Sequence, residues 1–228
     1  MAVISVNSPK KSSHSGPLTA MDVMLSAPVI PVIVLTDPQH AVLLARALVA
    51  GGVRMLEVTL RTPQALSCIE AIARQVPEAV AGAGTVRSAA DVKACANAGA
   101  QFLVSPGYTP AIGQASRDAG LPLLPGVATG SEIMMAQADG LSQLKFFPAL
   151  QAGGTAMLKA WNGPFGDVQF CPTGGVSPAN ALEFLTLPNV VCVGGSWLTP
   201  FEAMAQGDWA QITALAHQAC MLKRNVFK

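Results

Sequence analysis

The sequence predicts an α/β protein of the (β/α)8 TIM-barrel class, with one barrel domain over residues 21–228. Three observations lead to this prediction. The chain of 228 residues suits one larger α/β domain. Short apolar runs alternate with helix-like segments, and these runs number eight. A doubly wound open sheet is the alternative, but no G-x-G-x-x-G phrase follows the first run.

The predicted strands are the apolar runs at residues 29–35, 53–60, 79–83, 101–104, 121–125, 142–147, 168–171 and 190–193. Four phrases repeat one pattern, a helical segment, a glycine and an apolar run: LVAGGVRMLEV, CANAGAQFLVS, SRDAGLPLLPG and AQADGLSQLKF. Gly52, Gly99, Gly120 and Gly140 hold equivalent places in them. Glycine is favoured just past a helix because it adopts a left-handed backbone without steric cost. We therefore expect a repeated β/α unit of about 20 to 25 residues.

Composition excludes several classes of partner. Fourteen basic and thirteen acidic residues leave a net charge of +1, so no polybasic surface for nucleic acid or membrane is expected. No apolar stretch approaches the roughly 20 residues that span a bilayer, and the start lacks a secretory leader pattern. We expect a cytoplasmic protein with a small-molecule partner. Residues 1–20, rich in Ser, Lys and Pro at their start, are expected to form a mobile tail.

The cysteines and histidines form no recognisable metal or disulfide pattern. The cysteines are widely spaced and odd in number, at positions 68, 95, 171, 192 and 220. Without a C-x-x-C pair they are expected to be packing residues in a reducing compartment. His14, His40 and His217 lie far apart in the chain. Neither a metal site nor a histidine base is therefore predicted.

Charged residues stand at the ends of two predicted strands. In LEVTLR (56–61), the two-residue period puts Glu57 and Arg61 on one face, with Leu56 and Val58 on the other. Because the apolar face must meet the outer helices, Glu57 and Arg61 are expected to point into the barrel and its mouth. In QLKFFPA (143–149), the same parity makes an inward Lys145 plausible. Catalytic residues of barrels lie at these carboxyl ends.

The predicted third strand, AVAGAGT (79–85), carries small residues that leave room before Thr85. An acid, two bases and a hydroxyl could thus converge on one cavity. A buried ion-pair network without a catalytic task is the other interpretation. Burial of each ion costs several kcal/mol before compensation, so function is the better explanation for three such residues at one rim. Lys159 falls in a helix-like segment and is expected to be a solvated helix residue.

Two glycine-rich phrases, CPTGGVSPAN (171–180) and VGGSWL (193–198), follow the last two predicted strands. Loops at this position of a barrel commonly bind phosphate through backbone N–H groups and the start of a short helix. Gly-Gly pairs also occur in ordinary turns. Their presence in both expected loops favours an anion site.

The motifs LEVTLRT, GAGTV, SPG, LKFFPA, CPTGG and GGSW stand in this order over about residues 22–220. As a set they resemble the class I aldolases that cleave 2-keto-3-deoxy-6-phosphogluconate (KDPG), a family that also acts on 4-hydroxy-2-oxoglutarate (KHG). The resemblance implies a Schiff-base lyase of the Entner–Doudoroff pathway, without a cofactor and assembled as a homotrimer. It further implies roles for Lys145 as the Schiff-base lysine, Glu57 as general acid/base, Arg61 as carboxylate ligand, Thr85, Pro106, Phe147 and Thr173 as the pyruvate-side pocket, and Gly174, Gly175 and Ser196 as the phosphate site.

The chain departs from the pattern of that family at Leu150, where its members often carry an acidic residue after FFPA, and in its longer start. Two alternatives to KDPG cleavage stay open. The first is an aldolase that prefers KHG and yields pyruvate and glyoxylate. The second is a non-catalytic sugar-phosphate-binding barrel, against which the presence of both Lys145 and Glu57 argues.

Overall fold

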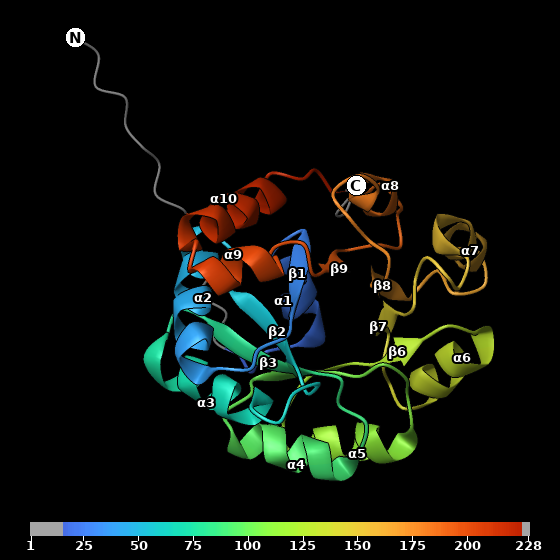
Figure 1. Cartoon of the computed structure of the whole chain (residues 1–228). Helices are drawn as coiled ribbons and strands as arrows, with labels where there is room; N and C mark the ends of the chain where they lie inside the picture. Colours follow the sequence, from blue (N-terminus) through green and yellow to red (C-terminus); the bar gives the residue numbers. More distant parts are fainter. Residues whose placement is uncertain (1–15, 225–228) are drawn as a thin grey trace.

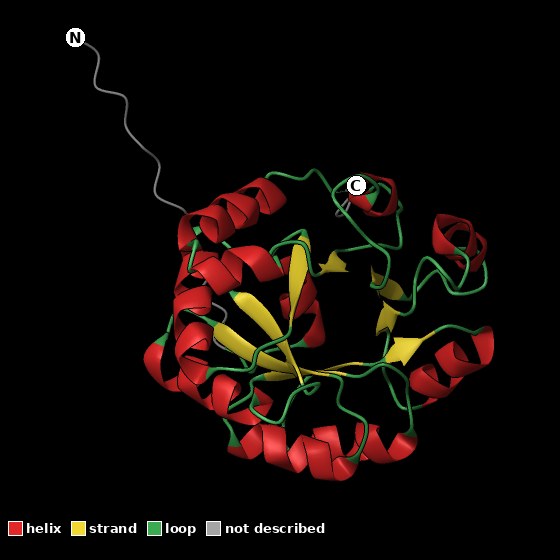
Figure 2. Cartoon of the chain, in the orientation of Figure 1, coloured by secondary structure: helices red, strands yellow, loops and turns green. Residues whose placement is uncertain are grey.

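The computed structural model describes residues 16–224, in which short parallel strands form an inner layer and helices form an outer layer (Figure 1, Figure 2). The predicted tail lies mostly at residues 1–15, outside the described residues. Within the described part, Thr19 caps the first helix, which begins at Ala20. Leu18 packs against buried residues of that helix and of the strands.

Every predicted apolar run contains a strand or part of one. The strands are β1 (Val29–Ile33), β2 (Met55–Thr59), β3 (Val80–Gly84), β4 (Phe102–Val104), β5 (Leu123–Leu124), β6 (Gly126–Val127), β7 (Gln143–Phe146), β8 (Gln169–Pro172) and β9 (Val193–Gly195). Two boundaries differ from the prediction. The fifth run continues past Pro125 as β6, because proline has no N–H for the ladder and divides the strand. The eighth strand starts at the end of its predicted run, at Val193.

The helices follow the strands on the outside. They are α1 (Ala20–Leu25), α2 (Pro38–Ala50), α3 (Ala65–Gln75), α4 (Ala89–Asn97), α5 (Pro110–Asp118), α6 (Gly130–Ala138), α7 (Gly154–Trp161), α8 (Ala181–Leu185), α9 (Phe201–Gln206) and α10 (Trp209–Cys220). Most of the outer helices begin with a Ser, Thr or Asp cap, such as Asp37 before α2 and Thr129 before α6. Such caps satisfy backbone N–H groups that have no partner inside the helix.

The strands form two parallel ladders. One has the order β5-β4-β3-β2-β1-β9 and the other β6-β7-β8. Only Pro125 separates β5 from β6 along the chain. At the other junction, isolated parallel bridges join Phe170 to Val190 and Thr173 to Gly194. The fold is therefore α/β with a parallel sheet in two segments.

The predicted glycine pattern is confirmed at four helix ends. Gly52, Gly99, Gly120 and Gly140 all have positive φ, between 65° and 96°. At the end of α2, Gly52 N–H donates to the Val49 carbonyl and Val53 N–H to the Leu48 carbonyl. The same pair of bonds recurs after α4, α5 and α6, so one capping motif turns each helix into the next strand.

Buried apolar residues divide into two clusters. The larger lies between strands and helices and includes Leu56 and Val58 of β2. The smaller contains Phe102 and Cys171 from the strands together with Val23 and Met24 of α1. Met55 and Val80, the first residues of β2 and β3, pack against this smaller cluster. Helix α1 thus covers the amino ends of the strands and leaves their carboxyl ends free.

Candidate active site

Lys145 and Glu57 meet across the interior of the strand layer. Glu57 lies on β2 and Lys145 on β7, and the Lys145 Nζ atom is 3.3 Å from Glu57 Oε1. The two residues are only 5% and 3% exposed. Their neighbours Leu56, Val58 and Leu144 belong to the cluster beneath the helices. The alternation predicted for both strands is therefore confirmed, and it buries an ion pair inside the sheet.

The Glu57 carboxylate fits because β3 has no side chain opposite it. A Cβ atom on Gly84 would lie 2.4 Å from Glu57 Oε1, closer than any real contact. A Cβ atom on Gly82 would likewise lie 2.2 Å from Cζ of Phe102, so glycine at this position leaves space for the phenylalanine ring. The small residues of AVAGAG thus leave room for larger side chains from neighbouring strands, as predicted.

Thr85 follows β3 directly and has a φ of 61°. No other described non-glycine residue has a positive φ. A left-handed backbone costs an L-residue about 1–2 kcal/mol. Strain of this kind tends to occur at functional sites. Thr85 is half-buried beside the strand that makes room for Glu57.

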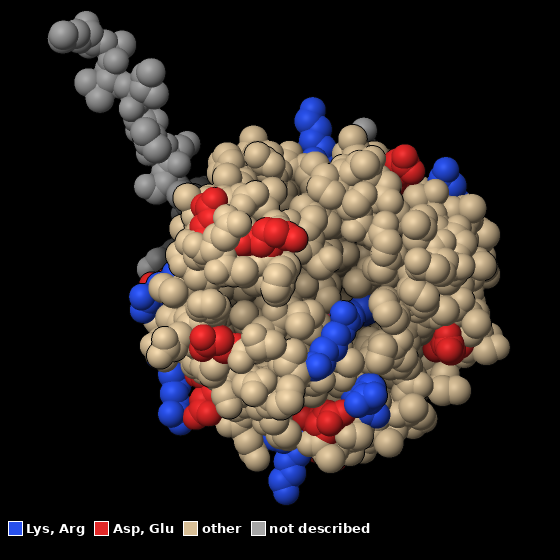
Figure 3. Space-filling model, viewed as in Figure 1, with Lys and Arg blue, Asp and Glu red and all other residues tan. Residues whose placement is uncertain are grey.

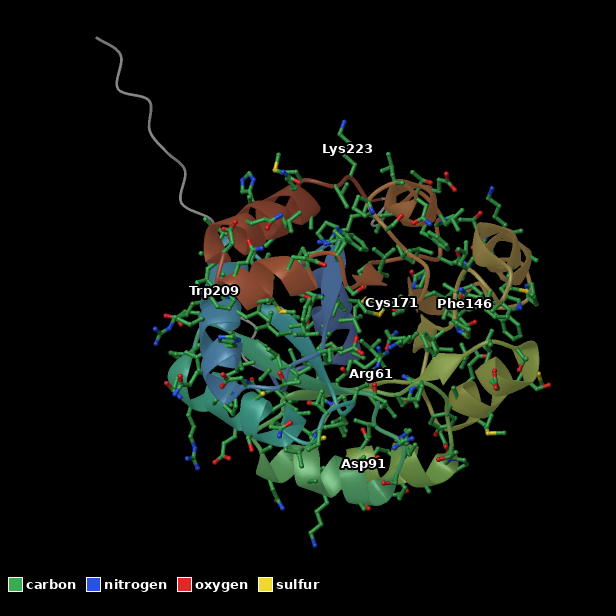
Figure 4. All side chains as sticks on the ribbon, in the orientation of Figure 1. Arg61, Asp91, Phe146, Cys171, Trp209 and Lys223 are labelled. Carbon is green, nitrogen blue, oxygen red and sulfur yellow. The ribbon has the colours of Figure 1, made fainter. Side chains whose placement is uncertain are left out.

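Arg61 lies in the turn after β2 and is exposed. Figure 4 labels it over the middle of the strand layer. It forms no ion pair with the residues that the structure describes. Elsewhere on this face, acidic and basic side chains are scattered around the rim (Figure 3). A guanidinium group without a carboxylate partner at the mouth can bind an anionic group.

Pro106 follows β4 and is half-buried. A Cβ atom on Gly126 would lie 2.4 Å from the carbonyl carbon and oxygen of Pro106, so the absent side chain permits this close packing. Gly126 is the register partner of Lys145. The Lys145 backbone N–H donates to the Pro125 carbonyl at 2.8 Å. Pro106 therefore packs on the strand that adjoins the lysine.

Phe147 lies beside the ion pair, and Thr173 follows the strand that neighbours β7. The ring centroid of Phe147 is 5.1 Å from Lys145 Nζ, a cation–π distance. Thr173 follows β8 and is 6% exposed. An isolated parallel bridge pairs its backbone with that of Gly194. A Cβ atom on Gly194 would lie 2.2 Å from Thr173 Oγ1. The Thr173 hydroxyl therefore occupies the space that a side chain at position 194 would fill.

The loop after β8 carries Gly174 and Gly175, with φ values of 99° and 76°. Their backbones are held by the loop after β7, since Leu150 N–H donates to the Gly174 carbonyl at 3.1 Å. A Cβ atom on Gly175 would lie 2.6 Å from Leu150 Cβ. Ser196 is exposed in the loop after β9. The next helices, α8 and α9, begin beyond these residues, at Ala181 and Phe201.

The sequence analysis gave no catalytic role to Lys159 or to the cysteines. Lys159 is exposed on α7. All five cysteines are unpaired. Cys171 is buried on β8, and Cys192 is buried directly before β9, although its predicted strand included it. Burial raises the pKa of Cys68 to about 11 and that of Cys95 to about 12. These thiols are packing residues.

Two of the three histidines, His40 and His217, lie in the part of the chain that the structure describes. His14 lies outside the described residues. His40 packs edge-on against Trp209, with ring centroids 5.8 Å apart, and His217 lies on α10. Within residues 16–224, no three His, Cys, Asp or Glu side chains gather as metal ligands would. No helix over the same residues is long and apolar enough to cross a bilayer.

Sequence reasoning did not identify the side chains that three glycines of the site accommodate. Gly84, Gly126 and Gly194 give space to Glu57, Pro106 and Thr173. A glycine inside a strand pattern is a signal of close backbone approach, but it does not name the residue that approaches. That residue comes from a different strand, so its identity depends on the sheet register.

A buried lysine beside a carboxylate, at the carboxyl ends of parallel strands, suits a lyase that works through a lysine Schiff base. Residues 21–215 match the family model described as KDPG and KHG aldolase. The chain is 52% identical over 202 residues to the 2-dehydro-3-deoxy-phosphogluconate aldolase of Pseudoalteromonas atlantica, covering 89% of this chain and 94% of that one. It is 50% identical over 201 residues to the KHG/KDPG aldolase of Escherichia coli K12, covering 88% and 94%.

Solved structures agree with these relatives. The KDPG aldolase of Legionella pneumophila, with pyruvate captured as a covalent carbinolamine, is 45% identical with a TM-score of 0.87, covering 89% of this chain and 98% of that one. The Zymomonas mobilis enzyme with 3-phosphoglycerate is also 45% identical with a TM-score of 0.87, covering 92% and 98%. The chain belongs to the KDPG and KHG aldolase family.

Proposed function

We propose that the protein is the class I aldolase that cleaves KDPG to pyruvate and glyceraldehyde 3-phosphate in the Entner–Doudoroff pathway. The buried pair of Lys145 and Glu57, 3.3 Å apart, is the observation that carries the proposal. A Schiff-base aldolase needs an amine to attack a ketone and an acid/base group within reach of the same carbon. The pair supplies both in one place.

The reaction starts when the neutral Lys145 amine attacks C2 of the substrate. The C–N bond forms and the ketone oxygen becomes a hydroxyl, giving a carbinolamine. Glu57, within hydrogen-bond distance of Nζ, first takes a proton from the Lys145 ammonium and gives it to the ketone oxygen. It then takes the proton that the nitrogen loses after attack and donates it to the departing hydroxyl. Water leaves, and an iminium ion joins C2 to Lys145.

The iminium then draws electrons from the C3–C4 bond. Glu57, directly or through a water molecule, removes the proton of the C4 hydroxyl, the C3–C4 bond breaks, and glyceraldehyde 3-phosphate departs. The remaining enamine takes a proton at C3 from Glu57. Hydrolysis of the resulting iminium releases pyruvate and restores the amine. Because the iminium serves as the electron sink, the proposed mechanism uses no cofactor.

The other candidate residues bind the two ends of the substrate. Arg61 binds the carboxylate, which its exposed position at the mouth supports. Phe147 lies against the lysine and restricts the pyruvate portion. The proposed pyruvate-side residues are Thr85, Pro106, Phe147 and Thr173, and the proposed phosphate-binding residues are Gly174, Gly175 and Ser196.

We also propose that the two ladders close into one (β/α)8 barrel within a single domain of residues 21–228. The lone Pro125 between β5 and β6, and the parallel bridges from β8 toward β9, support closure. A cytoplasmic homotrimer is the assembly that the family resemblance implies. Exposed Val34 and Phe201, which line one apolar cavity of about 420 Å³, are consistent with a subunit contact.

A KHG aldolase that yields pyruvate and glyoxylate is the second candidate. The family description names both substrates, and so does the name of the Escherichia coli relative. The pyruvate half is common to the two reactions. The candidates differ in the aldehyde half of the substrate, which carries a phosphate in KDPG and none in KHG, so the effect of phosphate on activity separates them.

Trapping of the iminium tests the proposal directly. Pyruvate with borohydride is expected to leave a stable reduced adduct on Lys145, located by peptide mass analysis. The Lys145→Arg variant should stay folded and lose both adduct and turnover, because guanidinium remains protonated near neutral pH. Lys159 on α7 is the internal control. An adduct at Lys159, or full turnover by Lys145→Arg, would exclude the mechanism.

A further inference from the structure

Tyr108 connects the loop after β4 to the turn after α6 by a side-chain hydrogen bond. It follows Pro106 and Gly107 in the chain and is 8% exposed. Its hydroxyl donates a hydrogen bond to Oδ2 of Asp139, the C-cap residue of α6. Asp139 itself is half-buried. The bond therefore joins the β4–α5 loop to the turn before β7, the strand of Lys145.

Helix α5 makes space for this hydroxyl. A Cβ atom on Gly113 would lie 2.4 Å from Tyr108 Oη and 3.1 Å from its ring. Gly113 is inside α5, where glycine is normally less favourable than alanine. Its presence there is explained by the tyrosine, since any other residue would displace the hydroxyl.

The fastened loop adjoins the lysine strand. Ser105 Oγ donates to the Gly107 carbonyl at 2.7 Å, which shapes the turn around Pro106. The Pro106 carbonyl packs where a Cβ atom of Gly126 would be, and Gly126 is paired in register with Lys145. A shift of the loop would therefore move Pro106 relative to Lys145.

We infer that Tyr108 is a positioning residue, which holds Pro106 against the strand of Lys145 through its hydrogen bond to Asp139 and so sets the wall of the pyruvate pocket. The inference rests on the proposed function. Burial, followed by the neighbouring Asp139, raises the pKa of Tyr108 to about 12, so the phenol remains a donor at neutral pH.

The test is Tyr108→Phe, which keeps the ring and removes the donor. Loss of one hydrogen bond is expected to raise the pyruvate concentration for half-maximal borohydride trapping by about threefold to tenfold. KM for KDPG and for KHG should rise by similar factors, because both substrates share the pyruvate half. Asp139→Asn keeps an acceptor oxygen and should stay close to wild type. Asp208→Asn serves as the matched control, because Asp208 accepts a bond from the Gln211 N–H at 3.0 Å at the exposed start of α10.

Gly113→Ala provides a second and independent test. Its methyl group should displace the Tyr108 hydroxyl and raise the half-saturating pyruvate concentration as Tyr108→Phe does. In the Tyr108→Phe background the same alanine should add little, since the hydroxyl it strikes is gone.

Three results would overturn the inference. The first is Tyr108→Phe with unchanged pyruvate trapping and a lower melting temperature, which would make the bond purely structural. The second is a change on one substrate only. The third is an equal effect of Gly113→Ala with and without the tyrosine hydroxyl. Failure of the wild-type protein to trap pyruvate at Lys145 would instead contradict the proposed function, so the two failures are distinguishable.

Discussion

Lys145 Nζ lies 3.3 Å from Glu57 Oε1, although the two residues are 88 positions apart in the chain. Both side chains are almost completely shielded from solvent. Burial of two charges is costly, and such a pair usually contributes little net stability. Its presence is better explained by proton transfer between the two groups during the proposed reaction than by a structural role.

Glu57→Gln should keep the shape of the site and remove the proton carrier. We expect kcat to fall by about 10²- to 10⁴-fold, the range typical of general acid–base catalysis. Steady-state kinetics with KDPG measure the kcat of the variant and of the wild type. Glu70, a half-buried residue of α3 paired with Arg74, supplies the control Glu70→Gln, which should retain kcat. A Glu57→Gln enzyme with wild-type turnover would remove the carboxylate from the mechanism.

Thr85→Gly should release backbone strain. The φ of 61° at Thr85 is unfavourable for threonine and accessible to glycine. Thr85→Ala retains the strain but loses the hydroxyl, so the difference between the two variants isolates the backbone effect. Thr85→Gly is expected to unfold with a free energy about 1 kcal/mol higher than Thr85→Ala. Urea unfolding of both variants measures this difference in unfolding free energy. Equal stabilities would mean that Thr85 stores no strain.

Ser196→Ala is the cleanest test of phosphate binding. Substitution at Gly175 is less informative, because a side chain there would strike Leu150 and oppose a φ of 76°. Exposed Ser196 can lose its hydroxyl without such a clash. We expect KM for KDPG to rise by about threefold to tenfold, as for one lost hydrogen bond, while KHG cleavage changes little.

Ser177→Ala, in the same loop as the glycines, is a suitable comparison because the hydrogen bonds recorded for Ser177 among the described residues use its backbone. Its N–H donates to Asn180 Oδ1, and its carbonyl accepts from Asn180 N–H. Equal losses on both substrates for Ser196→Ala would show that the serine supports the fold. A wild-type enzyme indifferent to phosphate would favour the KHG reaction.

The buried thiols should make stability sensitive to alkaline pH. Burial raises the pKa of Cys68 to about 11 and of Cys95 to about 12, from 9.0 in the unfolded chain. Their stabilising contribution is complete below pH 9.0 and is lost as the pH rises through about 11 and 12, because the unfolded state then releases protons first.

The slope of unfolding free energy against pH measures this effect. Cys68→Ala should flatten the slope between pH 9 and 11. Iodoacetamide at pH 8 should leave Cys68 and Cys95 unmodified in the folded protein and label them after unfolding. Rapid labelling of either thiol in the native state would contradict their burial.

Local patterns in the sequence were sufficient to predict much of this architecture. A glycine after each helix and the alternation in LEVTLR depend on neighbours within a few residues, so they were readable from the chain. The fit of Glu57 against Gly84 and the anchoring of Tyr108 by Asp139 depend on register between distant elements. The division of the fifth strand at Pro125 was also missed, although proline in a strand is a known signal.

Helix α1 has a consequence for the order in which products leave. Val23 and Met24 fill the amino end of the strand layer, so substrate and products must share the opposite opening. In the proposed reaction pyruvate is still bonded to Lys145 when the aldehyde is formed. The aldehyde therefore has to depart first and pyruvate last, and product inhibition by pyruvate should be competitive with KDPG because both occupy the same free enzyme.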